Sequence, residues 1–146
     1  MDTKIHFLVV NDSDVMQKVI VALLREVGYI KISEADDGEM ALRSLKSAKA
    51  IGSPVDFIIT DCAMPLMNGL ELIRAVRNQD DAGDMPILMI TAEAKTENIV
   101  AAIDAGADSY LIKPFKAASL GKKIEQLLAS KGLKDAANMP RGLDSR

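Results

Sequence analysis

The sequence predicts a doubly wound α/β fold, in which helices cover both faces of a five-stranded parallel sheet. The main observation is an alternation: five short apolar runs rich in β-branched residues are each followed by a stretch with apolar residues at helical spacing. The first run, residues 5–10 (IHFLVV), has the near-continuous apolar character of a strand buried on both faces. Together these observations predict five strands and five helices in one sheet.

The strands are expected where an apolar run is bounded by polar or turn-forming residues. These runs are residues 5–10, 30–35, 55–60, 87–90 and 109–112. The third is the clearest, because it ends at Asp61 and Pro65 stops regular structure soon afterwards.

The helices are expected where apolar residues recur every three or four positions. In the first helix these are Val15, Val19, Leu23 and Val27, followed by Gly28, a residue that tolerates the positive φ found at helix ends. The second helix spans about 38–49. The apolar positions of the remaining helices are Met40, Leu42 and Leu45; Leu70, Ile73 and Val76; Ile99, Val100 and Ile103; and Leu120, Ile124, Leu127 and Leu128.

Length and composition predict a single domain followed by a short tail. The chain has 146 residues, 49% of them apolar, which is enough for one packed core. No sustained period continues beyond Gly132. We therefore expect a domain at residues 1–131 and a flexible C-terminal tail at 132–146.

Charge and cysteine content narrow the class of protein. The 18 basic and 21 acidic residues leave a net charge of −3, the wrong sign for a surface that binds nucleic acid through its phosphates. The lone Cys62 can form no internal disulfide, which indicates a reducing compartment. No signal peptide or membrane-spanning run is visible. We expect a monomeric cytoplasmic protein that binds neither nucleic acid nor membranes.

Polar residues follow the predicted strands at the points where the strands end. Asn11 and Asp12 follow the first, Asp61 the third, Thr91 the fourth and Lys113 the fifth. Each alone could be a helix cap or a turn residue. In an open parallel sheet, however, the carboxyl ends of the strands line the crevice where ligands bind, and the joint occurrence favours one shared site.

The residue types at these ends suit phosphoryl transfer. The carboxylates of Asp12 and Asp61 are hard oxygen ligands of the kind that Mg²⁺ prefers. A carboxylate beside Mg²⁺ can also attack phosphorus as a nucleophile and form an aspartyl phosphate. A lysine and a hydroxyl, here Lys113 and Thr91, can bind the phosphoryl oxygens whose charge grows during transfer.

At these motifs the sequence resembles the receiver domains of two-component response regulators, and most of all their CheY-like chemotaxis branch. The motifs are FLVVND, DCAMPLMNGLEL, ILMITAEAKTENIVAAIDAGA and YLIKPF, and the similarity runs from about residue 4 to 131. The resemblance implies a flavodoxin-like fold with the strand order 2-1-3-4-5. It also implies a signalling switch that is not an enzyme acting on external substrates.

The resemblance implies that Asp61 accepts a phosphoryl group from a histidine kinase of the CheA type. Mg²⁺ would be bound by Asp12, by Asp61 and by the backbone carbonyl of Ala63. Asn11 stands where the family usually has an acid that holds the ion through water, so this position departs from the pattern. We expect the amide to weaken Mg²⁺ binding without abolishing it, because it can still accept a hydrogen bond from a metal-bound water.

Further roles follow from the same resemblance. Lys113 and Thr91 would contact the phosphoryl oxygens, and the bond between Lys113 and Pro114 would be cis. Tyr110 would be the aromatic side chain whose rotation reports the state of Thr91. Ala63 and Glu93 would flank the path of the hydrolytic water and tune autodephosphorylation.

Output would be a population shift on the face formed by the fourth helix, the fifth strand and the fifth helix. The partner could be a flagellar motor switch protein, and a phosphatase could act on the phosphorylated form. Thr96 and Ile103 on this face differ from the best-known chemotaxis receivers, and residues 46–54 (KSAKAIGSP) form a segment several residues longer than theirs. The output could instead be that of a phosphate sink or of a regulator of a non-flagellar partner.

Two other classes remain as alternatives. A haloacid dehalogenase-like phosphatase would use Asp12 as nucleophile with Asp14 two residues on, but Met16 stands where a Thr or Val is usual and no second acidic pair is visible. A flavodoxin-like FMN carrier would need hydroxyls and glycines after the first strand, and Asp12 would repel the phosphate there.

Overall fold

The computed structural model describes residues 4–62, 68–79, 83–91 and 96–131, except for the side chains of residues 96–98 and 131. The five strands are β1 (His6–Val10), β2 (Lys31–Ala35), β3 (Phe57–Asp61), β4 (Ile87–Thr91) and β5 (Ser109–Ile112). The five helices are α1 (Asp14–Glu26), α2 (Gly38–Ala50), α3 (Gly69–Arg77), α4 (Thr96–Ala105) and α5 (Ala117–Lys131). No helix within the described ranges is long and apolar enough to cross a membrane.

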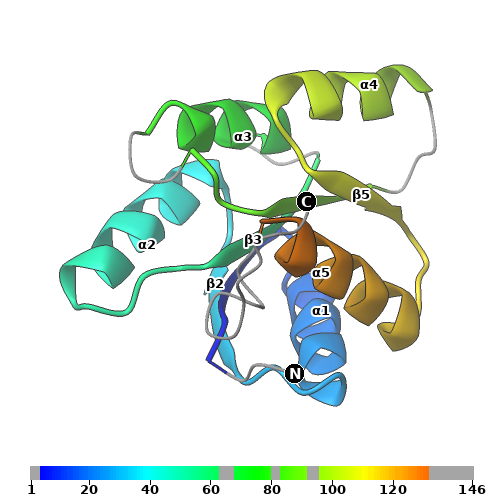
Figure 1. Ribbon diagram of the computed structural model, residues 1–146, viewed down its shortest axis with the longest axis horizontal. Coiled ribbons are helices and arrows are strands. Elements are labelled where there is room, and N and C mark those ends of the chain that lie inside the picture. Colours follow the sequence, from blue (N-terminus) through cyan, green and yellow to red (C-terminus); the bar gives the residue numbers. More distant parts are fainter. Residues whose placement is uncertain (1–3, 63–67, 80–82, 92–95, 132–146) are drawn as a thin grey trace.

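The strands form one parallel sheet in the order β2-β1-β3-β4-β5. Figure 1 shows α1 and α5 on one face of this sheet and α2, α3 and α4 on the other. The predicted fold class and strand order are therefore confirmed. The strand limits agree to within two residues, the largest shift being in β3, which begins at Phe57 instead of residue 55.

Two hydrophobic clusters hold the helices on the sheet, because successive strand side chains point to opposite faces. On one face Leu8 and Ile58 of the central strands pack with residues of α2, α3 and α4. On the other face Phe7 and Phe57 pack with residues of α1 and α5. All of β1 is buried, as its unbroken apolar run predicts.

Part of the predicted apolar stripe of α1 faces solvent, contrary to expectation. Val15 is 73% exposed and Val19 is 43% exposed, whereas Ile20, Val21 and Leu24 are buried against the sheet. The helix carries two overlapping apolar stripes, and packing between the sheet and α5 buries the stripe that contains these three residues. A similar correction applies to α4, because the predicted Val100 and Ile103 are 49% and 47% exposed.

The first three helices begin with side-chain caps. Ser13 caps α1 by accepting from the Met16 backbone N–H, and Asp37 caps α2 in the same way. Asn68 and Glu71 form a reciprocal capping box at the start of α3. These caps fix the helix N-termini, with their partial positive charge, at the carboxyl edge of the sheet.

Candidate functional site

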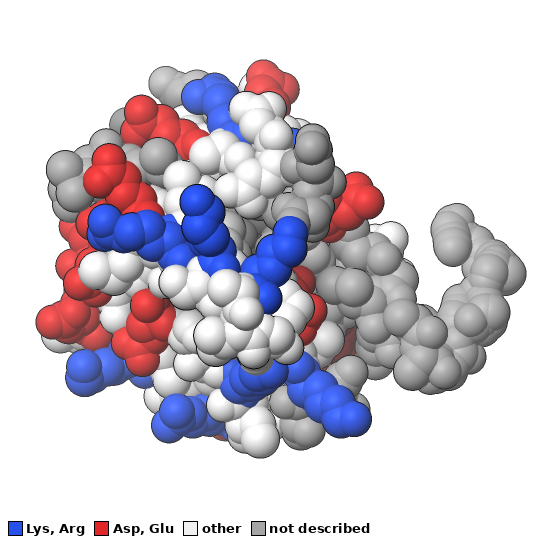
Figure 2. Space-filling view, turned by 90° about the vertical axis from the view of Figure 1, so that its left-hand side faces the viewer, with Lys and Arg blue, Asp and Glu red and all other residues white. Residues whose placement is uncertain are grey.

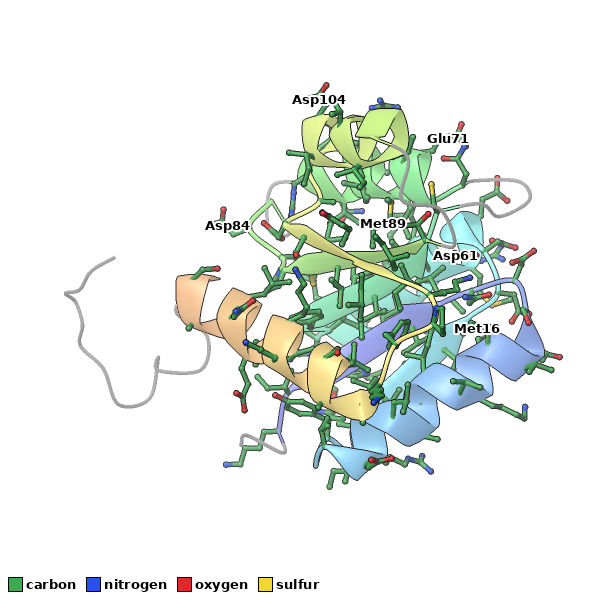
Figure 3. All side chains as sticks on the ribbon, turned by 90° about the vertical axis from the view of Figure 1, so that its right-hand side faces the viewer. Met16, Asp61, Glu71, Asp84, Met89 and Asp104 are labelled. Carbon is green, nitrogen blue, oxygen red and sulfur yellow. The ribbon has the colours of Figure 1, made fainter. Side chains whose placement is uncertain are left out.

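The residues predicted to form the site lie at the carboxyl edge of the sheet. Asp61 ends β3 and Thr91 ends β4, and Lys113 follows β5. The parallel register sets Asp61 beside Ile90 and Thr91 beside Ile112, and the Lys113 backbone N–H donates to the Thr91 carbonyl at 2.9 Å. Figure 3 shows Asp61 at this edge, near the beginning of α1 where Met16 lies.

Asp61 and Lys113 form an ion pair in a partly enclosed setting. Lys113 Nζ lies 3.4 Å from Asp61 Oδ1, and the exposed fractions of the two side chains are 23% and 12%. Burial raises the pKa of the Asp61 carboxyl above 3.8, and the Lys113 charge and the Cys62 backbone N–H oppose this rise. The charge of Asp12 raises the pKa further, so the two carboxylates are close enough to repel each other.

The raised pKa predicts how stability should depend on pH. A carboxyl whose pKa is higher in the folded than in the unfolded protein favours folding below the unfolded value of 3.8, and this contribution is lost as pH rises through the folded pKa. Asp61→Asn should therefore be more stable than wild type near neutral pH, and the difference should shrink as pH falls through the folded pKa and be smallest below 3.8. Urea unfolding of both proteins in EDTA at several pH values measures this, and a pH-independent difference would contradict it.

Asn11 is almost fully buried, with 1% of its surface exposed. Its Oδ1 accepts from the Ser13 backbone N–H at 2.9 Å, and its own backbone N–H donates to the Ala35 carbonyl. Its Nδ2 has no hydrogen-bond partner among the described residues. The Ser13 N–H fixes the amide orientation, because flipping the amide would set two donors against each other. At position 11, therefore, one donor has no acceptor among the described residues, and the oxygen keeps a second lone pair.

The sequence analysis did not identify Gln17, whose side chain bonds both to the segment that follows β1 and to the end of β2. Its buried side-chain nitrogen lies 2.6 Å from the Asn11 carbonyl, 2.9 Å from the Ala35 carbonyl and 3.0 Å from Asp36 Oδ1. It therefore holds the end of β1 against the end of β2. A signal existed in the sequence, since Gln17 precedes the buried Ile20 and Val21 by three and four residues and so shares their helix face.

The start of α3 approaches the backbone of Asp61 so closely that only glycine fits. A Cβ on Gly69 would lie 2.3 Å from the Asp61 carbonyl oxygen and 3.0 Å from Cys62 Cα. The Gly69 N–H also donates to the Cys62 carbonyl at 2.9 Å. Gly69 therefore fixes the distance between α3 and the strand end that carries Asp61.

Gly69→Ala should destabilise the protein by about 1 to 3 kcal/mol, the usual cost of forcing an extra methyl into a packed site. The neighbours are backbone atoms, so the strand end or the helix must move. Gly83→Ala is the matched control, because its Cβ would have no neighbour closer than 3.7 Å. Urea unfolding compares them, and an equal effect of the two substitutions would mean that the close approach is not restrictive.

Some of the remaining predicted site residues lie within the described structure and others lie outside it. Thr91 is buried, and Tyr110 is half-buried with Lys123 Nζ 5.5 Å from its ring centre. The bond between Lys113 and Pro114 is cis, as the resemblance implies. Ala63 and Glu93 lie outside the described residues, as does the predicted tail at 132–146.

The donor chemistry fits a hard cation. Within the described ranges no group of three His, Cys, Asp or Glu side chains could bind a metal ion. Two mutually repelling carboxylates, those of Asp12 and Asp61, meet at the strand ends instead. Two carboxylates whose remaining partners are neutral oxygens and water are a usual Mg²⁺ environment, since this ion keeps several waters when it binds protein.

Comparison with known proteins agrees with this reading. A family model described as the response regulator receiver domain matches residues 7–125. The chemotaxis protein CheY of Pseudomonas aeruginosa is 43% identical over 120 residues, which cover 82% of this chain and 93% of that protein.

Solved structures show the same relationship. The chemotaxis protein CheY4 of Vibrio cholerae has a TM-score of 0.76 at 34% identity, covering 85% of this chain and 98% of that one. The receiver domain of a Pseudomonas aeruginosa sensor histidine kinase has a TM-score of 0.74 at 33% identity, covering 85% and 97%. That structure has a magnesium ion coordinated in its active site cleft.

Proposed function

The chain belongs to the response regulator receiver domain family, CheY-like signalling switches of two-component systems, and from this premise we propose that Asp61 is its phosphoryl acceptor. The observation that carries the proposal is the ion pair of Asp61 and Lys113 at 3.4 Å, one strand away from the hydroxyl of Thr91. A nucleophilic carboxylate, a cation and a hydroxyl are thereby held on three adjacent strand ends.

The proposed reaction transfers a phosphoryl group from a histidine kinase of the CheA type. An Asp61 carboxylate oxygen attacks phosphorus, the P–N bond of the donor phosphohistidine breaks, and the imidazole leaves with the electron pair and takes up a proton. Lys113 and Thr91 would bind the transferred phosphoryl oxygens. Mg²⁺ would be held by Asp12, Asp61 and the Ala63 carbonyl, and it supplies charge neutralisation when bound.

We assign the output to the face formed by α4, β5 and α5, in keeping with a role in chemotaxis. This face exposes Val100 and Ile103 on α4. The part of the face formed by β5 and α5 carries a hollow lined by Tyr110, Leu111, Ile112, Pro114, Phe115, Lys116, Ser119 and Lys123. Exposed apolar side chains next to lysines suit a protein partner, such as a flagellar motor switch protein or a phosphatase. Tyr110 would couple this hollow to Thr91.

Several further assignments complete the proposal. Ala63 and Glu93 would tune the hydrolysis of the acyl phosphate. Residues 1–131 would form the receiver and 132–146 a tail outside it. The protein would act as a monomer in the cytoplasm, where a histidine kinase has access to it.

Incubation with acetyl phosphate and Mg²⁺ tests the proposal. Acetyl phosphate can serve as donor because the site itself supplies the nucleophile and the cation, and acetate is the leaving group. We expect one phosphate per chain, mapped to Asp61 by mass spectrometry, and none on Asp61→Asn. Equal labelling of the variant and wild type would refute the assignment, and a phosphate on Asp12 would favour a phosphatase of the haloacid dehalogenase type.

A further inference from the structure

A groove lies at the amino-terminal edge of the sheet, opposite the candidate phosphorylation site. It is lined by Leu45, Lys46, Lys49, Pro54, Val55, Gln79 and Met85 and has a volume of about 350 Å³. These residues come from the second half of α2, the segment before β3, the end of α3 and the segment before β4. Figure 3 shows Asp84, the neighbour of Met85, at the end of the molecule away from Asp61.

The floor of this groove is apolar and its rim on α2 is basic. Leu45 and Val55 are core residues and Met85 packs against the same cluster. Lys46 and Lys49 lie almost one helical turn apart, so their side chains can reach the same ligand group. Figure 2 views the side of the molecule on which α2 lies and shows Lys and Arg side chains gathered around uncharged surface in the middle of that side. No acidic residue is among the described lining residues, although the whole chain carries a net charge of −3.

Partly buried hydrogen bonds hold the wall before β3. His6 Nδ1 lies 3.0 Å from the Ser53 carbonyl and 3.2 Å from the Pro54 carbonyl, and His6 Nε2 lies 2.7 Å from Ser33 Oγ. The turn that precedes this wall contains Gly52 at a φ of +81°, a conformation that glycine adopts without strain. The wall at Ser53 and Pro54 is therefore tied to β1 and β2.

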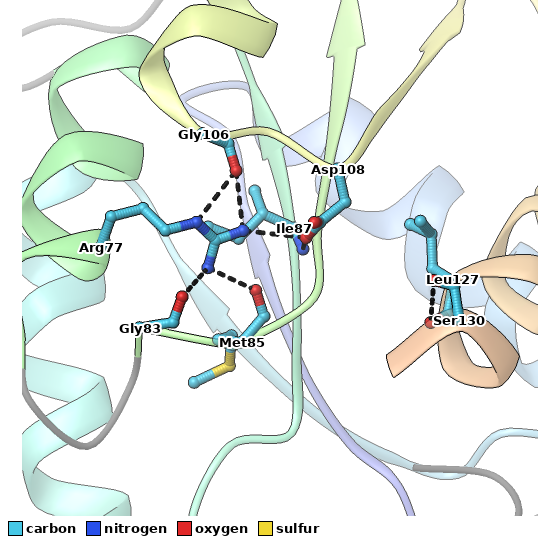
Figure 4. Close-up of polar contacts among 8 residues, drawn as sticks. All are labelled: Arg77, Gly83, Met85, Ile87, Gly106, Asp108, Leu127 and Ser130. Atoms are coloured by element: carbon cyan, nitrogen blue, oxygen red, sulfur yellow. Dashed lines mark hydrogen bonds and ion pairs between the residues drawn. The ribbon is translucent and has the colours of Figure 1, made fainter. Parts of the chain in front are cut away.

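Arg77 holds the opposite wall, as Figure 4 shows. Its Nη1 donates to the Met85 carbonyl at 2.7 Å and to the Gly83 carbonyl at 3.1 Å. Its Nε and Nη2 donate to the Gly106 carbonyl, and Nη2 also pairs with Asp108 at 2.8 Å. Both walls are thus fixed by side chains bonded to backbone carbonyls, and a groove fixed before binding loses little conformational entropy on binding.

We propose that this groove binds a small anionic amphiphile, with an apolar chain on the Leu45, Val55 and Met85 floor and a carboxylate at Lys46 and Lys49. At roughly 30 Å³ per water-sized group, about ten carbon-sized groups fill the groove. Its volume is at the lower end of the small-molecule range. A docked helix would need anchors over several turns, whereas this lining comes from the ends of short segments.

The test is an NMR titration with straight-chain carboxylates from butanoate to tetradecanoate, each below its micelle concentration. Amide signals of the groove residues should shift saturably, with affinity rising roughly two- to fourfold per methylene and levelling off near ten carbons. Octanoate should bind about tenfold more tightly than 1-octanol. Shifts without saturation, or equal affinity for octanoate and 1-octanol, would overturn the proposal.

The double variant Lys46→Gln/Lys49→Gln should bind octanoate about tenfold more weakly and 1-octanol unchanged. Both side chains are exposed, so the variant should fold normally and still accept phosphate from acetyl phosphate. Lys18→Gln/Lys122→Gln, on α1 and α5, removes the same charge elsewhere and should leave octanoate binding unchanged. If wild type sediments with anionic lipid vesicles or binds acidic amphipathic peptides but fails to bind free octanoate, the assigned ligand class is wrong.

Discussion

Replacing Asn11 by Asp is expected to tighten Mg²⁺ binding by about ten- to a hundredfold. An acid about 5 Å from the ion would attract it by roughly 2 to 7 kcal/mol for effective dielectric constants of 80 to 20. The added charge also repels Asp12 and Asp61 in the metal-free site, which cancels about half of this and leaves a net gain of ~1 to 3 kcal/mol. The substitution also replaces the donor Nδ2, which has no partner among the described residues, with an acceptor.

The same substitution should make stability depend more strongly on the ion. Position 11 is 1% exposed, so a carboxylate there is poorly solvated until a cation binds. Isothermal titration at fixed ionic strength gives the affinities, and thermal unfolding with and without Mg²⁺ gives the linked stability. Asn78→Asp is the control, because it adds the same charge at an exposed position at the C-terminal end of α3. Equal Mg²⁺ affinity of Asn11→Asp and wild type would mean that position 11 does not face the ion.

Replacing Arg77 by Met is expected to lower the free energy of unfolding by about 3 kcal/mol or more. The guanidinium donates to carbonyls of Gly83, Met85 and Gly106 and pairs with Asp108, and both charged side chains are only 18% exposed. Methionine keeps the apolar stem but supplies no donor, so three carbonyls and a carboxylate lose a partner. Arg77→Lys should recover part of the loss, because one ammonium cannot reach all of these acceptors.

Arg74→Met is the matched control for this prediction, since Arg74 lies one turn earlier on α3 and is exposed. We expect it to change stability by less than about 0.5 kcal/mol. Urea unfolding by linear extrapolation measures all three variants. Similar effects of Arg74→Met and Arg77→Met would show that the contacts of Arg77 add nothing beyond those of an exposed arginine.

The strands and the gathering of Asn11, Asp61, Thr91 and Lys113 at one edge could be predicted from the sequence. An unbroken apolar run has few ways to be buried, and a parallel sheet brings the carboxyl ends of its strands together whatever the details of packing. The face that α1 turns inward could not be predicted, because Val19 and Ile20 belong to apolar stripes of similar strength. Packing against α5 and the sheet decides between them.

The distant backbone partners of buried polar side chains could not be predicted from the sequence. Gln17 and Arg77 both resemble solvated residues on amphipathic helices, yet each satisfies carbonyls of other segments. A helix face can indicate that such a residue is buried, but no local pattern identifies its partners, which lie up to 31 positions away. The orientation of the Asn11 amide is another such detail, because it depends on the hydrogen bond from the Ser13 backbone N–H to Oδ1 and leaves Nδ2 without a partner among the described residues.

The parallel register has a consequence for how chain length can vary in this fold. Asp61 lies beside Ile90 and Thr91 beside Ile112, with neighbouring strands about 4.8 Å apart, so the sheet spaces the reactive groups at its carboxyl edge. A one-residue slip would turn every side chain to the opposite face, so an insertion within β3, β4 or β5 would separate them. An insertion at residues 51–54 enters the sheet at its other edge and leaves this spacing unchanged. We therefore expect this fold to accept added residues in that segment better than within a strand.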